Sequence, residues 1–175
     1  MIILADSGST KTHWCLMAAN GQCSDFYTDG INPFYQTQNA MLNSIVNQFL
    51  PQMSHLMWVG TVTHVFFYGA GCTPEKKPFV ANALQTVFKD AQVMVESDIL
   101  GAARALWQHK QGITCILGTG SNSCQYDGEK IVKNVPSLGF ILGDEGGGAV
   151  LGKRLVADIL KNQITGPLKQ EFLDK

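Results

Sequence analysis

The sequence is poor in charge. Only 15% of its 175 residues are Asp, Glu, Lys or Arg, and the formal net charge is -1. Because the charges are so evenly balanced, the sequence gives no electrostatic indication of binding to nucleic acid or to an anionic membrane. Hydrophobic residues make up 45%, which is typical of a folded protein rather than a disordered one. A chain of this length has room for one ordinary domain with a core and is short for two.

Long hydrophobic runs and paired cysteines are also missing. No apolar run approaches the roughly 18 residues that span a bilayer. The apolar start lacks a basic leader and predicts a first β-strand rather than a signal peptide. The five cysteines include no Cys-x-x-Cys pair, so we expect reduced, mostly packed thiols in a cytoplasmic protein. The four histidines lack metal-ligand spacing, and we expect them to be structural or at the surface. We expect the three tryptophans to be core or partly buried aromatics rather than a platform for a sugar.

The chain does contain a strand–turn–strand–turn–strand pattern that occurs twice. In the first copy a Gly/Ser/Thr turn joins the first two strands, and Asn20-Gly21 predicts a type I′ hairpin turn before the third. The second copy, about 110 residues later, has Asp127-Gly128 at its hairpin. This repetition indicates a duplicated lobe. The expected strands are 2–5, 13–18 and 22–28 in the first copy, and 113–117, 123–126 and 129–133 in the second.

Helices and further strands follow the first copy. Apolar residues recur at helical spacing over 41–50, and helices are also predicted from Pro74 and over 99–109. Strands are predicted over 64–68 and 93–95. Three antiparallel strands followed by these elements predict an α/β lobe with a mixed five-stranded sheet over residues 1–111. Residues 112–175 begin a second lobe, with a helix over 149–161 and a polar tail, and this copy is expected to be incomplete.

The two Gly/Ser/Thr turns have the composition of phosphate-binding loops. Glycine lets backbone N–H groups approach phosphate oxygens closely, and Ser and Thr hydroxyls add short donors. A carboxylate at the end of the preceding strand, Asp6, can hold Mg²⁺ directly or through water. Either turn alone is more often an ordinary connection, but their repetition favours a clamp on a polyphosphate. The candidate phosphate-binding residues are Gly8, Ser9, Thr10, Lys11 and Thr12 in one turn, and Gly118, Thr119, Gly120 and Ser121 in the other.

Two better-known phosphate motifs do not fit these turns. Residues 8–12 lack the upstream glycine of a P-loop, and no glycine precedes Lys11. The Gly118-x-Gly120 step is followed by a hairpin, whereas a dinucleotide-binding turn requires a helix there.

A phosphoryl transfer also needs a base for the acceptor hydroxyl. Asp98 is the best candidate because it ends a strand, begins a helix and lies in the same sheet as Asp6, although Asp at a helix start is commonly only a cap. Asp144 and Glu145 form a second acidic pair among glycines, which implies close approach of the backbone to a ligand. Asn32 is either an ordinary turn residue or a polar contact at the edge of the site.

Taken in order, these motifs resemble those of the N-acetylglucosamine kinases. The resemblance rests on Asp6 to Thr12, Ser97-Asp98, Leu117 to Asn122 and Gly139 to Gly146, and it spans about residues 2–160. These enzymes lie in the BadF/BadG/BcrA/BcrD ATPase family of the sugar kinase/Hsp70/actin superfamily. The resemblance implies an actin-like (RNase H-like) ATPase fold, with two lobes that close over ATP, Mg²⁺ and an amino sugar.

The resemblance also implies roles for individual residues. Thr10 and Thr119 would touch ATP phosphates, and Asp98 would be the base for the 6-hydroxyl of N-acetylglucosamine. In-line phosphoryl transfer depends mainly on positioning and charge neutralisation, which fits such a site. The sugar pocket would be lined by Asn32, Asn122, Ser137, Leu138, Asp144 and Glu145.

The sequence departs from the family in two respects. Leu138 stands where the animal enzymes carry Trp, which leaves the sugar less certain than the reaction. These kinases run to about 280 residues or more, so the residues that grip adenosine are expected beyond Lys175, and the 175-residue form alone is expected to be inactive if it is truncated. Two other functions stay open: a BadF-type ATPase that activates a partner dehydratase, and a non-catalytic sugar- or nucleotide-sensing domain. Beyond ATP and the sugar we expect no nucleic-acid or membrane partner, and a homodimer is an open alternative.

Overall fold

A computed structural model describes residues 1–54 and 60–174. Its centre is a five-stranded mixed sheet with the strand order β3-β2-β1-β4-β5. Strands β1, β4 and β5 are parallel neighbours, and β2 and β3 extend the sheet in antiparallel fashion. This is the predicted mixed five-stranded sheet. The strands are β1 (Ile2–Ser7), β2 (Lys11–Met17), β3 (Cys23–Asp29), β4 (His64–Gly69) and β5 (Gln92–Ser97).

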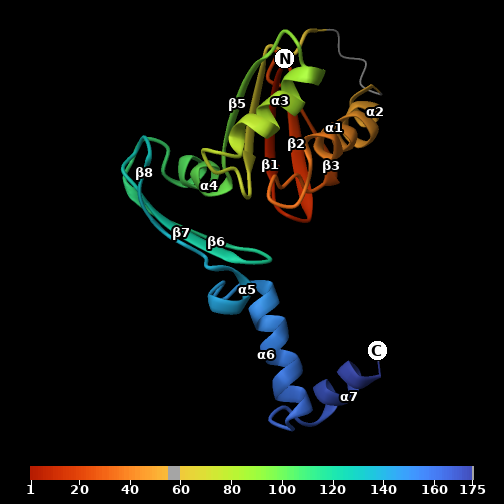
Figure 1. The fold of residues 1–175 in the computed structure, drawn as a ribbon, viewed down its shortest axis with the longest axis vertical. Coiled ribbons are helices and arrows are strands. Elements are labelled where there is room, and N and C mark those ends of the chain that lie inside the picture. The colour runs from red at the N-terminus through yellow and green to blue at the C-terminus, as the bar shows by residue number, and fades with distance from the viewer. Residues whose placement is uncertain (55–59, 175) are drawn as a thin grey trace.

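The main core lies on one face of this sheet, beneath a layer of helices (Figure 1). Alternate strand residues such as Ile3, Val65 and Phe67 are buried there, as the two-residue period of a strand requires. Trp14 stacks on Phe49 with ring centroids 4.3 Å apart. The covering helical segments are α1 (Gln38–Ser44), the π-helical turn η1 (Ile45–Phe49), α2 (Leu50–Ser54) and α3 (Lys77–Val87).

Helix α4 (Asp98–Trp107) joins this sheet to the second one. It contacts β4 and β5 of the first sheet, and β6 (Gly112–Leu117) and β7 (Ser121–Tyr126) of the second. At its end the ring of Trp107 packs on Gly112, where an added Cβ would lie 2.1 Å from the ring atom Cε2. The Trp107 indole N–H donates to the Ile113 carbonyl, 3.2 Å away.

The second sheet has three antiparallel strands in the order β6-β7-β8. Its strands are β6 (Gly112–Leu117), β7 (Ser121–Tyr126) and β8 (Ile131–Val135). The chain then runs through α5 (Gly139–Leu142), α6 (Gly148–Leu160) and α7 (Pro167–Leu173). Figure 1 shows α6 and α7 extending away from the first sheet rather than covering the second. Among the described residues no helix is both long and apolar enough to cross a bilayer.

Several local expectations need correction. The Asn20-Gly21 turn is not type I′, because Gly21 has a positive φ of 83° and Asn20 does not. The Gly21 N–H instead bonds the Ala18 carbonyl, which fits a longer loop closed by a left-handed glycine. The third strand of the second copy begins at Ile131 rather than residue 129, because the Asp127 carboxylate holds the N–H groups of Glu129 and Lys130 in the turn. Helices α5 and α7 were not predicted, and His55 and Trp58 lie outside the described residues.

Candidate active site

The carboxyl ends of the parallel strands bring the first group of candidate residues together. Ser7, Gly69 and Ser97 are paired across β1, β4 and β5, so these strands end level with one another. Asp6 is the penultimate residue of β1, and Asp98 directly follows β5. In open α/β sheets this edge is where ligands bind.

Asp98 is not the cap of helix α4. The N-cap residue is Ser97, and Asp98 lies in the first turn, where its carboxylate accepts the Ile99 N–H at 2.8 Å. Burial raises the pKa of Asp98, the Ile99 N–H opposes that rise, and the nearby Asp6 carboxylate adds to it. A desolvated carboxylate with a raised pKa is better suited to accept a proton than an exposed one.

The first turn is built on a buried hydroxyl network. Ser7 Oγ lies 2.6 Å from Thr12 Oγ1 and accepts the Ile31 N–H at 2.9 Å. Thr12 Oγ1 donates to the Asp29 carbonyl at 3.1 Å. Ser7 and Thr12 are fully buried, so both hydroxyls tie β1, β2 and the segment after β3 to one another.

The tip of the same turn is open to solvent. The Gly8 N–H donates to the Lys11 carbonyl at 3.0 Å and closes the turn. Ser9, Thr10 and Lys11 are exposed at this tip. Their hydroxyl, backbone and ammonium groups are therefore accessible to a phosphate, whereas Thr12 is placed to support the turn from within.

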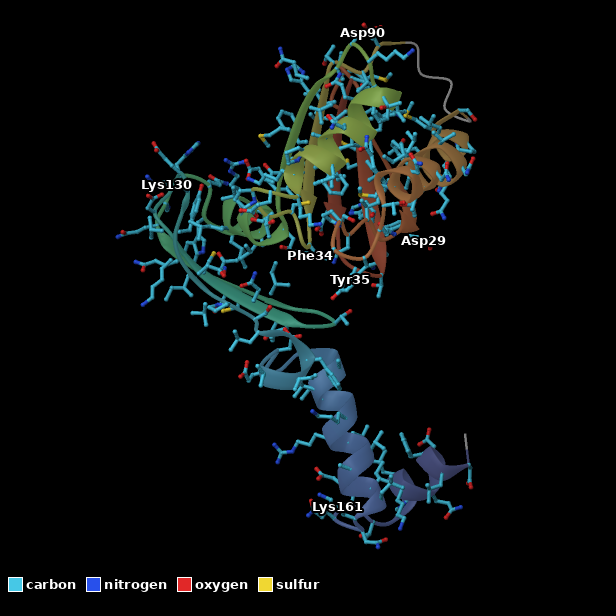
Figure 2. All side chains as sticks on the ribbon, in the orientation of Figure 1. Asp29, Phe34, Tyr35, Asp90, Lys130 and Lys161 are labelled. Carbon is cyan, nitrogen blue, oxygen red and sulfur yellow. The ribbon has the colours of Figure 1, made fainter. Side chains whose placement is uncertain are left out.

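Asn32 connects this turn to the neighbouring loop. Its Nδ2 donates to Ser9 Oγ at 3.0 Å, and its Oδ1 accepts the Phe34 N–H at 3.0 Å. Phe34 and Tyr35 follow on the lower end of the first lobe, well away from Asp90 at its upper end (Figure 2). Both aromatic rings are exposed. The structure therefore places Asn32 beside the first turn, as expected of a residue at the edge of the site.

The second turn is held by the loop that precedes α6. Asp144 Oδ1 accepts the Ser121 N–H at 3.1 Å, and the Asp144 N–H donates to the Ser137 carbonyl at 2.8 Å. The Gly148 N–H, at the start of α6, donates to the Gly118 carbonyl at 2.8 Å. Gly118 and Thr119 thus lie at the amino end of a 13-residue helix, where the helix dipole favours an anion.

The remaining candidate sugar residues surround this second turn. Leu138 has a left-handed φ of 57° and is largely exposed, and Glu145 is exposed as well. Asn122 alternates along β7 with the buried Cys124 and Tyr126, so it lies on the sheet face that packs on α4. Its Oδ1 accepts a hydrogen bond from Asn134 Nδ2 at 3.1 Å.

The candidate residues therefore form two groups, one on each sheet. In Figure 1 the β6–β7 turn lies opposite the lower end of the first sheet, where the β1–β2 turn is found. Sequence reasoning missed three residues that shape the first group: Ser7, Ile31 and Gln36, whose Oε1 accepts the Asn32 N–H at 3.0 Å. Ser7 was within the quoted motif, but its partners could not be identified from local spacing.

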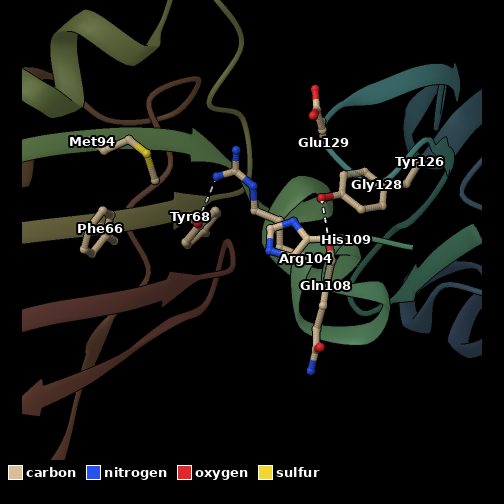
Figure 3. Close-up of a pocket in the computed structure, with 9 residues that line it drawn as sticks. All are labelled: Phe66, Tyr68, Met94, Arg104, Gln108, His109, Tyr126, Gly128 and Glu129. Atoms are coloured by element: carbon tan, nitrogen blue, oxygen red, sulfur yellow. Dashed lines mark hydrogen bonds between the residues drawn. The ribbon is translucent and has the colours of Figure 1, made fainter. Parts of the chain in front are cut away.

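A separate hollow is lined by residues of α4, of the first sheet and of the second sheet with its β7–β8 turn (Figure 3). Phe66, Tyr68 and Met94 come from the first sheet, Tyr126 comes from β7, and Glu129 comes from the turn between β7 and β8. Arg104 reaches across to donate to the Tyr68 hydroxyl at 3.1 Å. This hollow contains none of the candidate phosphate-binding or sugar-binding residues.

Comparison with known proteins gives a clear structural match. No protein-family model and no curated protein matches the sequence. The crystal structure titled "Putative N-acetylglucosamine Kinase" from Porphyromonas gingivalis matches 99% of this chain, with a TM-score of 0.92 and 46% sequence identity. A protein of the same title from Chromobacterium violaceum matches 99% with a TM-score of 0.69 and 20% identity, which shows a shared fold. The chain spans 61% and 62% of the lengths of these two proteins.

Proposed function

We propose that this chain has the actin-like ATPase fold and carries the phosphate-binding and catalytic part of an ATP-dependent amino-sugar kinase, because it resembles a putative N-acetylglucosamine kinase over 99% of its length. The observation that supports this most directly is the position of Asp98. Its partly desolvated carboxylate lies at the same sheet edge as Asp6 and the open first turn.

In the proposed reaction the 6-hydroxyl of the sugar attacks the γ-phosphorus of ATP. The new P–O bond forms as the bond to the β-phosphate oxygen breaks, and ADP leaves. Asp98 accepts the hydroxyl proton, which gives a neutral carboxylic acid that its buried setting favours. N-acetylglucosamine is the first sugar to test.

The two turns would hold the ATP phosphates from opposite sides. Ser9, Thr10 and Lys11 offer exposed donors from the first sheet. Thr119 offers its exposed hydroxyl from the second turn, and Gly118 beside it leaves space for a phosphate at the amino end of α6. Asp6 is exposed at a strand end, and its hard carboxylate oxygens suit Mg²⁺, directly or through water, which when bound would neutralise phosphate charge. Thr12 supports this arrangement from within the lobe.

The sugar would lie between Asn32 on the first lobe and Asn122 and Asp144 on the second. Asn32 is already oriented by Ser9 and Phe34, and Asp144 by Ser121. Amide and carboxylate groups fixed in this way can bind sugar hydroxyls with little further loss of side-chain entropy. Ser137, Leu138 and Glu145 lie on the same loop as Asp144 and are proposed to complete this side of the pocket.

The test uses a coupled assay to measure the release of ADP by the full-length protein in the presence of a panel of hexosamines. We expect ADP release that depends on N-acetylglucosamine, and isothermal titration should detect binding of the sugar to this chain. Replacing Asp90, an exposed carboxylate at the far end of the sheet, with Asn is the matched control for Asp98→Asn. A protein that neither binds nor phosphorylates any hexosamine would contradict the proposal.

A further inference from the structure

A cation and an aromatic ring lie beside Asn32, at the edge of the proposed sugar pocket. The Phe34 N–H donates to Asn32 Oδ1 at 3.0 Å, which ties the two residues together. The ammonium of Lys76 lies 5.7 Å from the centroid of the Phe34 ring and 5.4 Å from that of Phe79. Lys76 is half-buried, and more than half of Phe34 is exposed. The two side chains therefore offer a charged and an apolar surface next to a candidate sugar-binding residue.

The loop that follows β4 sets the position of this pair. An added Cβ on Gly71 would lie 2.4 Å from Asn32 Oδ1 and 2.8 Å from Phe34 Cδ2. Gly71 also has a positive φ of 74°, so a larger residue there would be strained and would displace both neighbours. The loop leaves β4 at Gly69, level with the end of β5 that precedes Asp98. The Phe34 ring thus packs on a loop that leaves the sheet next to the proposed base.

These contacts place the polar groups in an order that matches the parts of the substrate. Ser9 on the first phosphate-binding turn is bonded to Asn32, which is bonded to Phe34, and the Phe34 ring lies under Lys76. In the proposed reaction the 6-hydroxyl of the sugar faces the γ-phosphate, so that end of the sugar lies toward Ser9. The other end of the sugar ring, which carries the substituents on carbons 2 and 3, then lies toward Phe34 and Lys76.

The positive charge at this end of the pocket belongs to Lys76. Its neighbour Lys77 forms an ion pair with Glu96, whereas no carboxylate of residues 1–54 and 60–174 lies within ion-pair distance of Lys76. Glu75 is exposed, and a hydrogen bond with the Thr73 side chain lowers the pKa of its carboxyl group. An ammonium that is partly desolvated against aromatic rings and has no counter-ion attracts a carboxylate of a ligand.

We propose that Phe34 and Lys76 form a subsite that selects the sugar by the charge of its substituents, and that the preferred substrate is an N-acetylated hexosamine with a carboxylate on an ether substituent. The apolar C–H face of the sugar packs on the Phe34 ring. The carboxylate accepts charge-assisted hydrogen bonds from the Lys76 ammonium. A protonated amine on the sugar is repelled by the same ammonium. The subsite rests on the proposed function, because that reaction sets the orientation of the sugar.

A purely structural role for Lys76 makes a different prediction. If the side chain of Lys76 only covers the rings of Phe34 and Phe79, its replacement should affect the binding of all hexosamines alike. If Lys76 selects by charge, the sign of the effect should follow the charge of the sugar. A series of sugars that differ in charge therefore separates the two roles.

The experiment measures the binding and phosphorylation of three sugars by the full-length protein. Glucosamine carries a positive charge, N-acetylglucosamine carries none, and N-acetylmuramic acid carries a carboxylate on an ether substituent of the same ring. Isothermal titration without nucleotide measures binding, and ADP release gives kcat/KM. We expect N-acetylmuramic acid to bind most tightly and glucosamine most weakly, with the difference shrinking as salt is added, because salt screens exposed charges.

Lys76→Met removes the charge and keeps an unbranched side chain over the rings. This variant should bind N-acetylmuramic acid about fivefold more weakly, bind N-acetylglucosamine equally well, and bind glucosamine more tightly. Lys76→Arg keeps the charge and should retain the order of the unmodified protein. The control is Lys89→Met, which removes an exposed charge next to Asp90 at the far end of the first lobe and should change none of the three affinities (Figure 2).

The order of binding in the unmodified protein is itself a test, so the outcome does not depend on whether a variant folds. Equal affinity for the three sugars, or a change in Lys76→Met that is the same for all of them, would overturn the subsite. Phosphorylation of N-acetylglucosamine in that case would leave the proposed function standing. A protein that neither binds nor phosphorylates any of the three sugars would overturn both the subsite and the proposed function.

Discussion

At the scale of single residues, the proposed site depends on a few polar side chains that the lobe desolvates or holds in place. Asp98 is the clearest of them, because the environment that raises its pKa also sets its proposed chemistry. Ser7 is the structural counterpart, a buried hydroxyl that orders the first turn without reaching solvent.

Asp98→Asn should separate catalysis from stability. A missing general base lowers kcat by about 10²–10⁴-fold, while ATP binding, measured by titration, should be nearly unchanged. Retention of normal turnover would remove the assignment of Asp98 as the base.

The same variant should be more stable than the parent at neutral pH. The folded-state pKa of Asp98 is raised above its ordinary value of 3.8, so ionisation costs the folded state free energy, about 1.4 kcal/mol for each unit of difference. This free-energy cost is present at pH values above the raised pKa and absent at pH values below 3.8, the ordinary pKa. Thermal melts across pH should show the stability gain of Asp98→Asn shrinking as the pH falls. A gain independent of pH would contradict this account.

Ser7→Ala and Ser9→Ala form a matched pair on the same turn. Loss of the buried Ser7 hydroxyl leaves the Ile31 N–H without its partner and should cost about 1–3 kcal/mol in the free energy of unfolding. Ser9 is exposed and bonded to Asn32, so Ser9→Ala should change stability by less than about 0.5 kcal/mol and instead raise the KM for the sugar. Urea titrations and steady-state kinetics distinguish the two outcomes. Equal destabilisation by Ser7→Ala and Ser9→Ala would contradict these expectations.

At this scale the sequence indicated which residues lie near one another only where a motif was local. The run from Asp6 to Lys11 and the Ser97-Asp98 step follow from strand ends and turn composition. The partners of Ser7 could not be predicted, because its bond to Ile31 spans 24 residues and depends on how β3 ends.

At the scale of elements, the two turns differ in how tightly they are built. The second turn is packed against the Asp144 loop, and a Cβ on Gly120 would lie 2.6 Å from Asp144 Oδ1. A Cβ on Gly118 would meet nothing within 4 Å. The turn thus has one glycine required by packing and one open to a ligand.

Gly120→Ala and Gly118→Ala should therefore behave differently. Gly120→Ala forces Asp144 away from Ser121 and should lower the melting temperature of the protein by several degrees, since a displaced loop costs about 1–3 kcal/mol. Gly118→Ala should leave the melting temperature nearly unchanged and weaken ATP binding, because the added methyl group occupies the proposed phosphate position. Unchanged ATP affinity in Gly118→Ala would argue against the second turn as a phosphate loop.

Most strands could be located from the sequence within about two residues, because alternation and turn residues mark them well. The exceptions have local causes. Helix α5 is only four residues long and follows Leu138, whose left-handed backbone conformation could not be predicted from the sequence. In the Asp127 turn a side chain bonds two backbone N–H groups and delays the start of β8.

At the scale of the whole molecule, the two sheets have unequal cores. The first is filled by aromatic and aliphatic side chains from strands and helices, whereas the second has a small cluster that includes Ile99, Ala103, Cys124 and Tyr126. The sequence predicted the repeated lobe and its partial second copy. It could not predict how much apolar surface the second copy exposes, because exposure depends on which elements cover it.

Hydrogen exchange should reveal this inequality directly. Amides of β1 and β4 should open only with global unfolding, while those of β6, α6 and α7 should exchange at least a hundredfold faster through local opening. Mass spectrometry of peptides from each element would measure this. Uniform protection across both sheets would show that the second lobe is as stable as the first.

The contact between Trp107 and Gly112 gives the protein an optical reporter at the junction of its sheets. The indole ring rests on the first residue of β6, and its N–H is tied to Ile113, whereas Trp14 is sealed within the first core. Indole fluorescence depends on the polarity around the ring. A rotation of the second sheet against α4 would therefore change the emission of Trp107 and leave the emission of Trp14 constant. Domain motion in response to sugar or nucleotide can therefore be followed in real time through a residue that the chain already has.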